Sequence, residues 1–368
     1  MGAELPAGGQ ELETDVEGAA VVLEPGVRGW FARHPFITYL LRRIGSFVLT
    51  LWAAITATFF FFRLIPGNPI GAWIQNLEAN YDQNPTSSAR VVNHYKEVFG
   101  LSGNLWDQYT HYMYQVFIGR DLGPSLLSYP RPATYVIAQA LPWTMGLLID
   151  AVIISWVLGV LLGAVVGWRQ RGAFSEFMSY FAAVFTHIPY YFIALILLFF
   201  LAYKFTIFPE SEPYATGLNI SLTLPFIFSV LRHALLPAFS IVVVAAMGQI
   251  LGMRTQMIMV LGEDYLTFAQ AKGLRQGRIM VNYAMRNAFL PQVTALAISL
   301  GFIFSGNVLI EQIFAYPGVG HLLVQAVQTL DFNVMMGIID LSIIGVLTGA
   351  FILDLCLPLL DPRIRPGQ

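Results

Sequence analysis

The sequence predicts an all-α integral membrane protein with six transmembrane helices. Of its 368 residues, 56% are hydrophobic and only 11% are charged, and the mean hydropathy of +0.64 lies well outside the usual range of a soluble globular domain. Several apolar runs reach the roughly 20 residues that a helix needs to cross a bilayer. The net charge of −2 includes no basic excess, so nothing in the composition indicates a nucleic-acid partner.

The first third of the chain combines an acidic tail, one apolar span and a polar insert. Residues 1–30 hold six acidic residues with several glycines and prolines, and such a segment buries too little apolar surface to fold, so we expect a disordered cytoplasmic tail. Residues 31–65 contain the first span, which begins near Ile44 and ends at a Pro-Gly-Asn-Pro turn signal. Residues 66–141 are polar and aromatic and are long enough for a small helical domain outside the bilayer.

Residues 142–360 form the predicted transmembrane core. Its five spans are expected at 142–168, 177–203, 233–260, 288–310 and 334–357, whereas the run 218–231 is short and predicts an interfacial or re-entrant piece. With six spans, both termini, residues 168–176 and the 262–288 loop share one side, which carries thirteen of the twenty Lys and Arg residues if Arg254 is included. The positive-inside rule makes that side cytoplasmic. The 66–141 insert then faces outward, and residues 361–368 form a cytoplasmic C-terminus.

The 262–288 loop is the most informative polar segment. Leu261, Tyr265, Phe268 and Ala269 recur at helical spacing and predict one apolar face. Glu263 and Asp264 precede or open this helix, where its dipole favours negative charge, and Gly273 is placed to end it with a positive φ. A second helix is expected from about Gln276 and runs directly into the next span. Helix periodicity alone leaves two alternatives, a loop held at the lipid headgroups and a surface that docks a protein.

Specific sequence motifs in this loop favour a protein partner. Residues 269–274, A-Q-A-K-G-L, and 286–291, R-N-A-F-L-P, closely resemble the coupling loop of ABC-transporter permeases of the dipeptide, oligopeptide and nickel branch. Residues 63–69, 306–320 and 360–365 match the same branch in the expected order, and the resemblance covers roughly residues 38–366. In place of the Glu-Ala-Ala of the short permease signature, this chain has Thr267-Phe268-Ala269, as the peptide-type branch does.

The resemblance implies the type I ABC importer permease fold and a division of labour. Such a chain forms half of a translocation pathway in the inner or plasma membrane of a prokaryote, paired with a homologous second permease. Two cytosolic ATPase subunits bind ATP and Mg, and an extracytoplasmic solute-binding protein delivers the solute. The sequence itself contains no phosphate-binding loop of the form G-x-x-x-x-G-K-[ST], so we expect no enzyme activity and no cofactor in this chain.

The residues expected to couple this chain to an ATPase lie in and after the first loop helix. They are Glu263, Asp264, Tyr265, Phe268, Ala269, Ala271, Lys272, Gly273, Leu274 and Arg275.

Polar residues in and near the spans are candidates for the translocation path. An ionisable group inside a bilayer is costly, so Asp150 indicates either a path-lining residue or a structural contact between helices. Asp340 and Asp354 leave the same two alternatives, and Asp354 is close enough to the cytoplasmic end to pair with the Arg363 or Arg365 region. The other path candidates are Ser305, Asn307 and Glu311, and Glu311 is alternatively a solvated helix end. His187 has no partner at ligand spacing, so it predicts a satisfied interior polar group, and no metal site is expected.

Short peptides are the default substrate, with oligosaccharides and nickel as alternatives for the same machinery. The rival class is a self-sufficient membrane protein, either a secondary carrier or an intramembrane enzyme. A carrier of that kind shows internal repeats with paired broken helices, and an enzyme needs a nucleophile with a base or a metal cluster. Neither pattern is visible in this sequence.

Overall fold

The computed structural model describes residues 35–64, 97–100 and 102–360, and its described elements are helices. An isolated antiparallel bridge between Pro124 and Pro132 is the one extended pairing among these residues. The expectations for the acidic tail, for residues 66–96 of the insert and for the C-terminus 361–368 fall outside the described residues. The all-α membrane fold is confirmed for the part of the chain that the structure describes.

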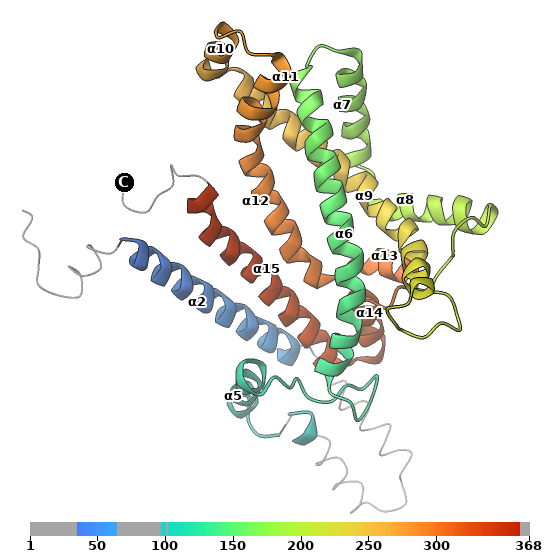
Figure 1. Ribbon diagram of the computed structural model, residues 1–368. Helices are drawn as coiled ribbons and strands as arrows, with labels where there is room; N and C mark the ends of the chain where they lie inside the picture. The colour runs from blue at the N-terminus through green and yellow to red at the C-terminus, as the bar shows by residue number, and fades with distance from the viewer. Residues whose placement is uncertain (1–34, 65–96, 101, 361–368) are drawn as a thin grey trace, which may run out of the picture.

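Five helical segments are long and apolar enough to cross a membrane. They are α2 (Pro35–Leu64), α6 (Ala133–Trp168), α9 (Leu224–Leu261), the continuous segment Gln276–Ser305 and α15 (Phe332–Leu360). In Figure 1 the cytoplasmic side proposed from the sequence is the end where α10 lies, and α6 and α9 both reach it.

The predicted span 177–203 is a bent pair of helices. Helix α7 (Ala173–Thr186) and the segment Tyr190–Lys204, made of α8 (Tyr190–Leu197) and η2 (Leu198–Lys204), meet at 94°. The break falls at Pro189, which lacks a backbone N–H and disfavours helical geometry at the residue before it. The membrane count is therefore five spans, or six if the bent pair counts as one (Figure 1).

Two helices begin earlier than the spans predicted from the sequence, because prolines and polar residues lie inside these longer helices. Helix α6 begins at Ala133 rather than at 142, and Pro142 lies in its interior. Helix α9 begins at Leu224 rather than at 233, so most of the predicted interfacial run belongs to α9. Pro225 occupies its first turn, where a missing N–H costs nothing.

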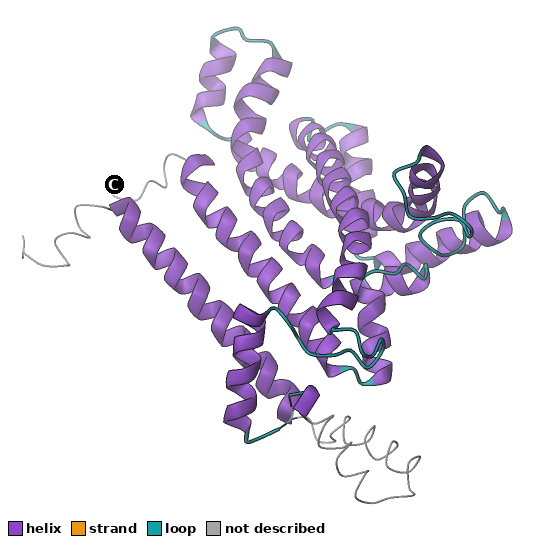
Figure 2. Ribbon diagram, turned by 60° about the horizontal axis from the view of Figure 1, so that its bottom comes forward, coloured by secondary structure: helices purple, strands orange, loops and turns teal. Residues whose placement is uncertain are grey.

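Helices α6 and α9 form the most extensive helix pair among the described elements. Figure 2 shows that the described part of the chain consists of helices joined by loops. Gly159, Gly163 and Gly167 recur at every fourth residue along α6 and face α9. A Cβ on Gly163 would lie 2.6 Å from the carbonyl oxygen of Ile250, and one on Gly167 would lie 2.6 Å from the Cβ of Met257. Small residues at this spacing let two backbones approach closely in a membrane. This seam carries the span that leads to the 262–288 loop.

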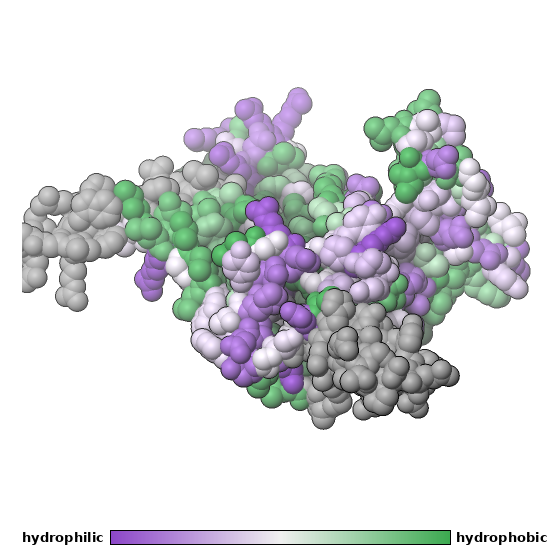
Figure 3. Space-filling view, turned by 90° about the horizontal axis from the view of Figure 1, so that it is seen from below, coloured by the Kyte–Doolittle hydropathy of each residue, from purple (hydrophilic) through white to green (hydrophobic). Residues whose placement is uncertain are grey.

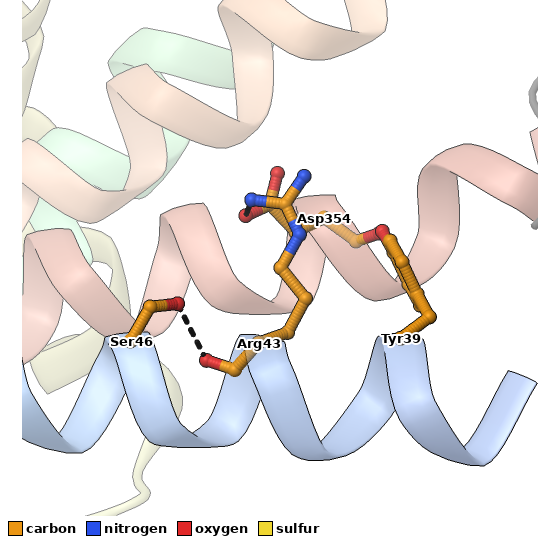
Figure 4. Close-up of polar contacts among 4 residues, drawn as sticks. All are labelled: Tyr39, Arg43, Ser46 and Asp354. Atoms are coloured by element: carbon orange, nitrogen blue, oxygen red, sulfur yellow. Dashed lines mark hydrogen bonds and ion pairs between the residues drawn. The ribbon is translucent and has the colours of Figure 1, made fainter. Parts of the chain in front are cut away.

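At the end of the molecule where α2 begins, α2 and α15 are joined by a polar contact (Figure 4). Arg43 forms an ion pair with Asp354 at 2.7 Å, and the Tyr39 hydroxyl donates to the backbone carbonyl of Asp354 at 2.8 Å. Asp354 therefore pairs with the first span, whereas the predicted partners Arg363 and Arg365 lie outside the described residues. Ser46 closes the group by donating to the carbonyl of Arg43 at 2.9 Å.

At the opposite end, the insert is anchored to the spans through helix α5 (Leu105–Tyr114). The Tyr112 hydroxyl donates to the buried carboxyl group of Asp340 on α15, and the hydroxyl groups of Tyr109 and Thr56 on α2 lie 3.0 Å apart. Asp340 thus makes a structural contact between segments. Seen from this end, hydrophilic residues gather near the centre of the face, with apolar residues beside them (Figure 3).

The glycine seam yields a stability prediction. Gly163→Ala places a methyl group against the backbone of α9, and overpacking of this kind costs about 1–3 kcal/mol. Gly45→Ala on α2 meets nothing within 4 Å, so we expect it to be neutral or slightly stabilising. Thermal unfolding of the purified chain in detergent should show a lower midpoint for Gly163→Ala alone. Equal midpoints for the two variants would contradict close packing of α6 on α9.

Candidate functional site

Helix α10 (Asp264–Ala271) follows α9 and stands at one end of the molecule (Figure 1). Glu263 is its N-cap residue, with extended backbone, and Asp264 lies in the first turn. At its other end Gly273 has a φ of +71°. The N–H of Leu274 donates to the carbonyl of Ala269, and that of Gly273 to the carbonyl of Gln270. These two bonds form a Schellman motif, which confirms that Gly273 ends the helix in a left-handed conformation.

The apolar residues of α10 point in two directions. Leu266 and Ala269 are buried, at 2% and 3% exposure, in a core shared with α6, α9 and the 276–289 segment. Phe268 is 68% exposed. The predicted single apolar face is therefore wrong, because Leu261 belongs to α9 and the residues between the two helices interrupt the helical phase. Helix α10 has one face fixed to the spans and an aromatic residue left free on another.

The other residues predicted to couple the chain to an ATPase lie in α10 or directly after it. The Asn287 amide donates to the Tyr265 hydroxyl at 2.6 Å, which ties α10 to the start of the next span. Leu274 is half-buried, whereas Ala271, Lys272, Gly273 and Arg275 are exposed.

The chain continues from this loop into the next span without a helical break. It passes through α11 (Gln276–Ile279), η3 (Met280–Met285) and α12 (Arg286–Phe302). The prediction that a helix starts near Gln276 and runs into the span is thus confirmed. Helix α10 is therefore joined to α9 on one side and, through α11 and η3, to α12 on the other.

The predicted span 288–310 ends earlier than expected. Helix α12 stops at Phe302, a 3-10 turn η4 (Ile303–Ser305) follows, and Gly306 has a φ of +71°. Ser305 donates to the carbonyl of Phe302 at 2.6 Å. Asn307 caps the short helix α13 (Val308–Ile313) by accepting from the N–H of Ile310 at 3.3 Å. Both of these path candidates thus bond within the turn that leads out of the span.

Glu311 is completely buried, so the alternative of a solvated helix end is wrong. Its Oε1 accepts from the Thr144 hydroxyl at 2.9 Å and from the N–H of Asn307 at 3.2 Å. Its Oε2 accepts from the N–H groups of Gly320 and His321 at 2.7 and 3.1 Å. These last two donors open helix α14 (Val319–Thr329), so the carboxylate lies where the helix dipole favours negative charge.

Glu311 and Thr144 together replace the missing cap of α14. The residue at the cap position is Gly318, which has no side chain, and the Thr144 hydroxyl accepts from the N–H of Val319 at 2.7 Å. A Cβ on Gly318 would lie 2.4 Å from both the Glu311 carboxylate and the Thr144 hydroxyl. Only glycine fits there. The Glu311 network, defined as Thr144, Asn307, Glu311, Gly318 and Gly320, therefore binds α6, α13 and α14 into one unit.

Electrostatics reflect this burial. Burial raises the pKa of Glu311 above its ordinary value, while its hydrogen bonds, that from Thr144 first, oppose the shift. Burial also raises the pKa of Tyr316 to about 12, with further contributions from the negative charges of Glu311 and Asp150. Tyr316 lies beside the Glu311 network, since its N–H donates to the backbone carbonyl of Glu311 at 2.8 Å. Asp150 is exposed on α6.

His187 lies at the end of α7 with its Nδ1 2.7 Å from the carbonyl oxygen of Ala183. It is satisfied as predicted, but it is exposed rather than interior. Among the described residues, no group of three or more His, Cys, Asp or Glu side chains is arranged to hold a metal ion.

Removing the charge of Glu311 tests the network. Glu311→Gln keeps the shape of the side chain but has only one acceptor oxygen for four donors. Either the N–H groups of Gly320 and His321, or the Thr144 hydroxyl and the N–H of Asn307, therefore lose their partner. We expect a loss of about 1–3 kcal/mol in the free energy of unfolding, measured by thermal or denaturant unfolding in detergent. Glu210→Gln, an exposed acid, is the control. Unchanged stability of Glu311→Gln would show that the buried carboxylate does not hold this unit.

Comparison with known proteins identifies the class. The model of a family described as "Binding-protein-dependent transport system inner membrane component" matches residues 159–366. That of "Binding-prot-dependent transport system membrane comp, N-term" matches residues 36–147. A polytopic helical chain with these matches is a membrane permease rather than an enzyme. The chain belongs to the family of binding-protein-dependent transport system inner membrane components.

Curated relatives align along nearly their whole length. The dipeptide transport system permease protein DppB of Lactococcus lactis subsp. cremoris is 28% identical over 329 residues, which cover 89% of this chain and 99% of the relative. The oligopeptide transport system permease protein AppB of Bacillus subtilis is 27% identical with the same coverage. DppB of Escherichia coli K12 is 27% identical over 346 residues, again covering 89% and 99%. The family resemblance seen in the sequence is confirmed.

Proposed function

We propose that this chain is one permease subunit of an ATP-driven importer of short peptides. It forms half of the translocation pathway with a homologous second permease, in the inner or plasma membrane of a prokaryote, with both termini cytoplasmic. Two cytosolic ATPase subunits bind ATP and Mg and close on α10, while an extracytoplasmic binding protein delivers the solute. Dipeptide and oligopeptide permeases among the relatives support the substrate class.

The observation that carries the proposal is the divided surface of α10. Leu266 and Ala269 fix the helix in the core of the spans, and Asn287 ties Tyr265 to α12. Phe268 remains 68% exposed at the tip of the molecule. An exposed aromatic side chain is a typical anchor for a protein partner. A partner that grips Phe268 and moves would displace α9 and α12 together, because α10 cannot turn independently of them.

The two faces of α10 allow a matched experiment. Phe268→Ala removes the exposed anchor, so we expect ATP-driven peptide uptake to fall about tenfold or more while the stability of the chain is unchanged. Leu266→Ala removes a buried side chain from the shared core and should destabilise the chain by about 2–5 kcal/mol. The measurements are uptake of labelled trialanine by cells carrying each substitution, membrane levels of the chain and its thermal unfolding.

Separation of the two effects is the decisive result. If Phe268→Ala left uptake unchanged at wild-type protein levels, α10 would not be the coupling surface. Uptake driven by an ion gradient with the purified chain alone would instead support a secondary carrier.

A further inference from the structure

Asp150 is an exposed acidic residue near the middle of α6, inside a membrane span. No described residue forms an ion pair with its carboxylate, and the described hydrogen bonds do not reach it. An ionised carboxylate facing lipid at this depth is costly, and such groups almost always face a bundle interior or a water-filled cavity. We therefore expect the face of α6 that carries Asp150 to be turned away from lipid in the assembled protein.

The residues that share this face change character along the helix. Trp143 and Gly146 lie seven and four residues before Asp150 and project on the same side. A Cβ on Gly146 would meet nothing within 4 Å, so the space beside Asp150 is open. Beyond Asp150 the exposed residues are large and aliphatic, Ile153, Ile154, Val157 and Leu158. Asp150 thus lies on this face where a position with open space, Gly146, gives way to exposed aliphatic side chains.

Aromatic rings meet at Trp143, which precedes Gly146 on α6. Trp143 stacks on Tyr214 with ring centroids 5.8 Å apart, and it meets Tyr316 edge-on at 5.9 Å. The negative charge of Asp150 also contributes to the raised pKa of Tyr316, after burial and the charge of Glu311. Glu311, the other acid near Tyr316, is fully engaged by its four hydrogen bonds. Asp150 is therefore the negative charge left over in this region.

We propose that Asp150 is a subsite for a primary ammonium group of the transported solute, with Trp143 bordering the part of the solute that follows. A carboxylate forms strong charge-assisted hydrogen bonds with an ammonium group, and aromatic rings nearby tolerate a cation or an apolar side chain. The open space at Gly146 leaves room for a short extended backbone between them. This inference rests on the proposed import of peptides and adds that the permease itself recognises the positive end.

The test compares three probes in cells that make the complete transporter. Trialanine carries an α-ammonium group, N-acetyl-trialanine carries none, and N-acetyl-Ala-Lys-Ala carries one on a side chain. Uptake of each is measured for wild type, Asp150→Asn, Asp150→Glu and the exposed-acid control Glu176→Gln, with membrane levels of the chain. The solute-binding protein is the same in every strain, so its own selectivity cancels when one probe is compared between strains.

We expect Asp150→Asn to lower uptake of trialanine about tenfold and to leave N-acetyl-trialanine unchanged, since one charge-assisted contact is lost. Asp150→Glu and Glu176→Gln should keep the wild-type preference. If Asp150→Asn also lowers uptake of N-acetyl-Ala-Lys-Ala, the subsite accepts any ammonium group. If uptake of that probe is unchanged, the subsite is specific for the α-ammonium group. Equal losses for all three probes, or none, would overturn the subsite. Absence of chain-dependent uptake of every probe in wild type would instead refute the peptide importer itself.

Discussion

The burial of one carboxylate, that of Glu311, is the constraint on which the end of the molecule that holds α13 and α14 depends. A buried charge costs several kcal/mol unless it is fully hydrogen-bonded, so every donor around it is required. Those donors come from α6, from the turn after α12 and from the first turn of α14. Glycine at position 318 leaves the space that the carboxylate and the Thr144 hydroxyl occupy. Tyr316 is held beside this network, because its N–H donates to the carbonyl of Glu311, and its ring meets that of Trp143 edge-on.

The opposite end of the molecule is organised by packing rather than by charge. Helix α10 is short and would not be stable alone, since isolated helices of this length are marginal in water. It persists because Leu266 and Ala269 enter a core with residues of α6, α9 and α12. The glycine seam between α6 and α9 extends this core along the spans. A partner that displaced α10 would therefore act on the spans, as the proposed coupling requires.

The sequence predicted the class of fold and the position of the polar loop between α9 and α12 because both depend on local signals. Long apolar runs indicate spans, the sign of the flanking charges indicates their orientation, and the glycine at 273 indicates a helix end. Helix boundaries were less predictable: spans were expected to begin at 142 and 233, whereas α6 begins at Ala133 and α9 at Leu224. The prediction of a single apolar face on α10 was wrong because α10 begins at Asp264, so its helical spacing does not continue from Leu261 of α9. Glu311 could be singled out, but its burial depends on contacts with residues 167 positions away. The spacing of Gly159, Gly163 and Gly167 was visible in the sequence and was the missed signal for the α6–α9 seam.

Contact between Phe268 and a cytosolic ATPase tests this picture most directly. The chain has a single cysteine, Cys356, so Phe268→Cys in a Cys356→Ser background places one thiol on α10, and Thr329→Cys places one at the exposed end of α14. Thiol-to-amine crosslinking in native membranes, followed by mass spectrometry, identifies what each position touches. We predict that position 268 crosslinks to a subunit containing a phosphate-binding loop and that position 329 does not. Active transporter in which position 268 crosslinks to no ATPase subunit would contradict the assignment of α10 as the coupling helix.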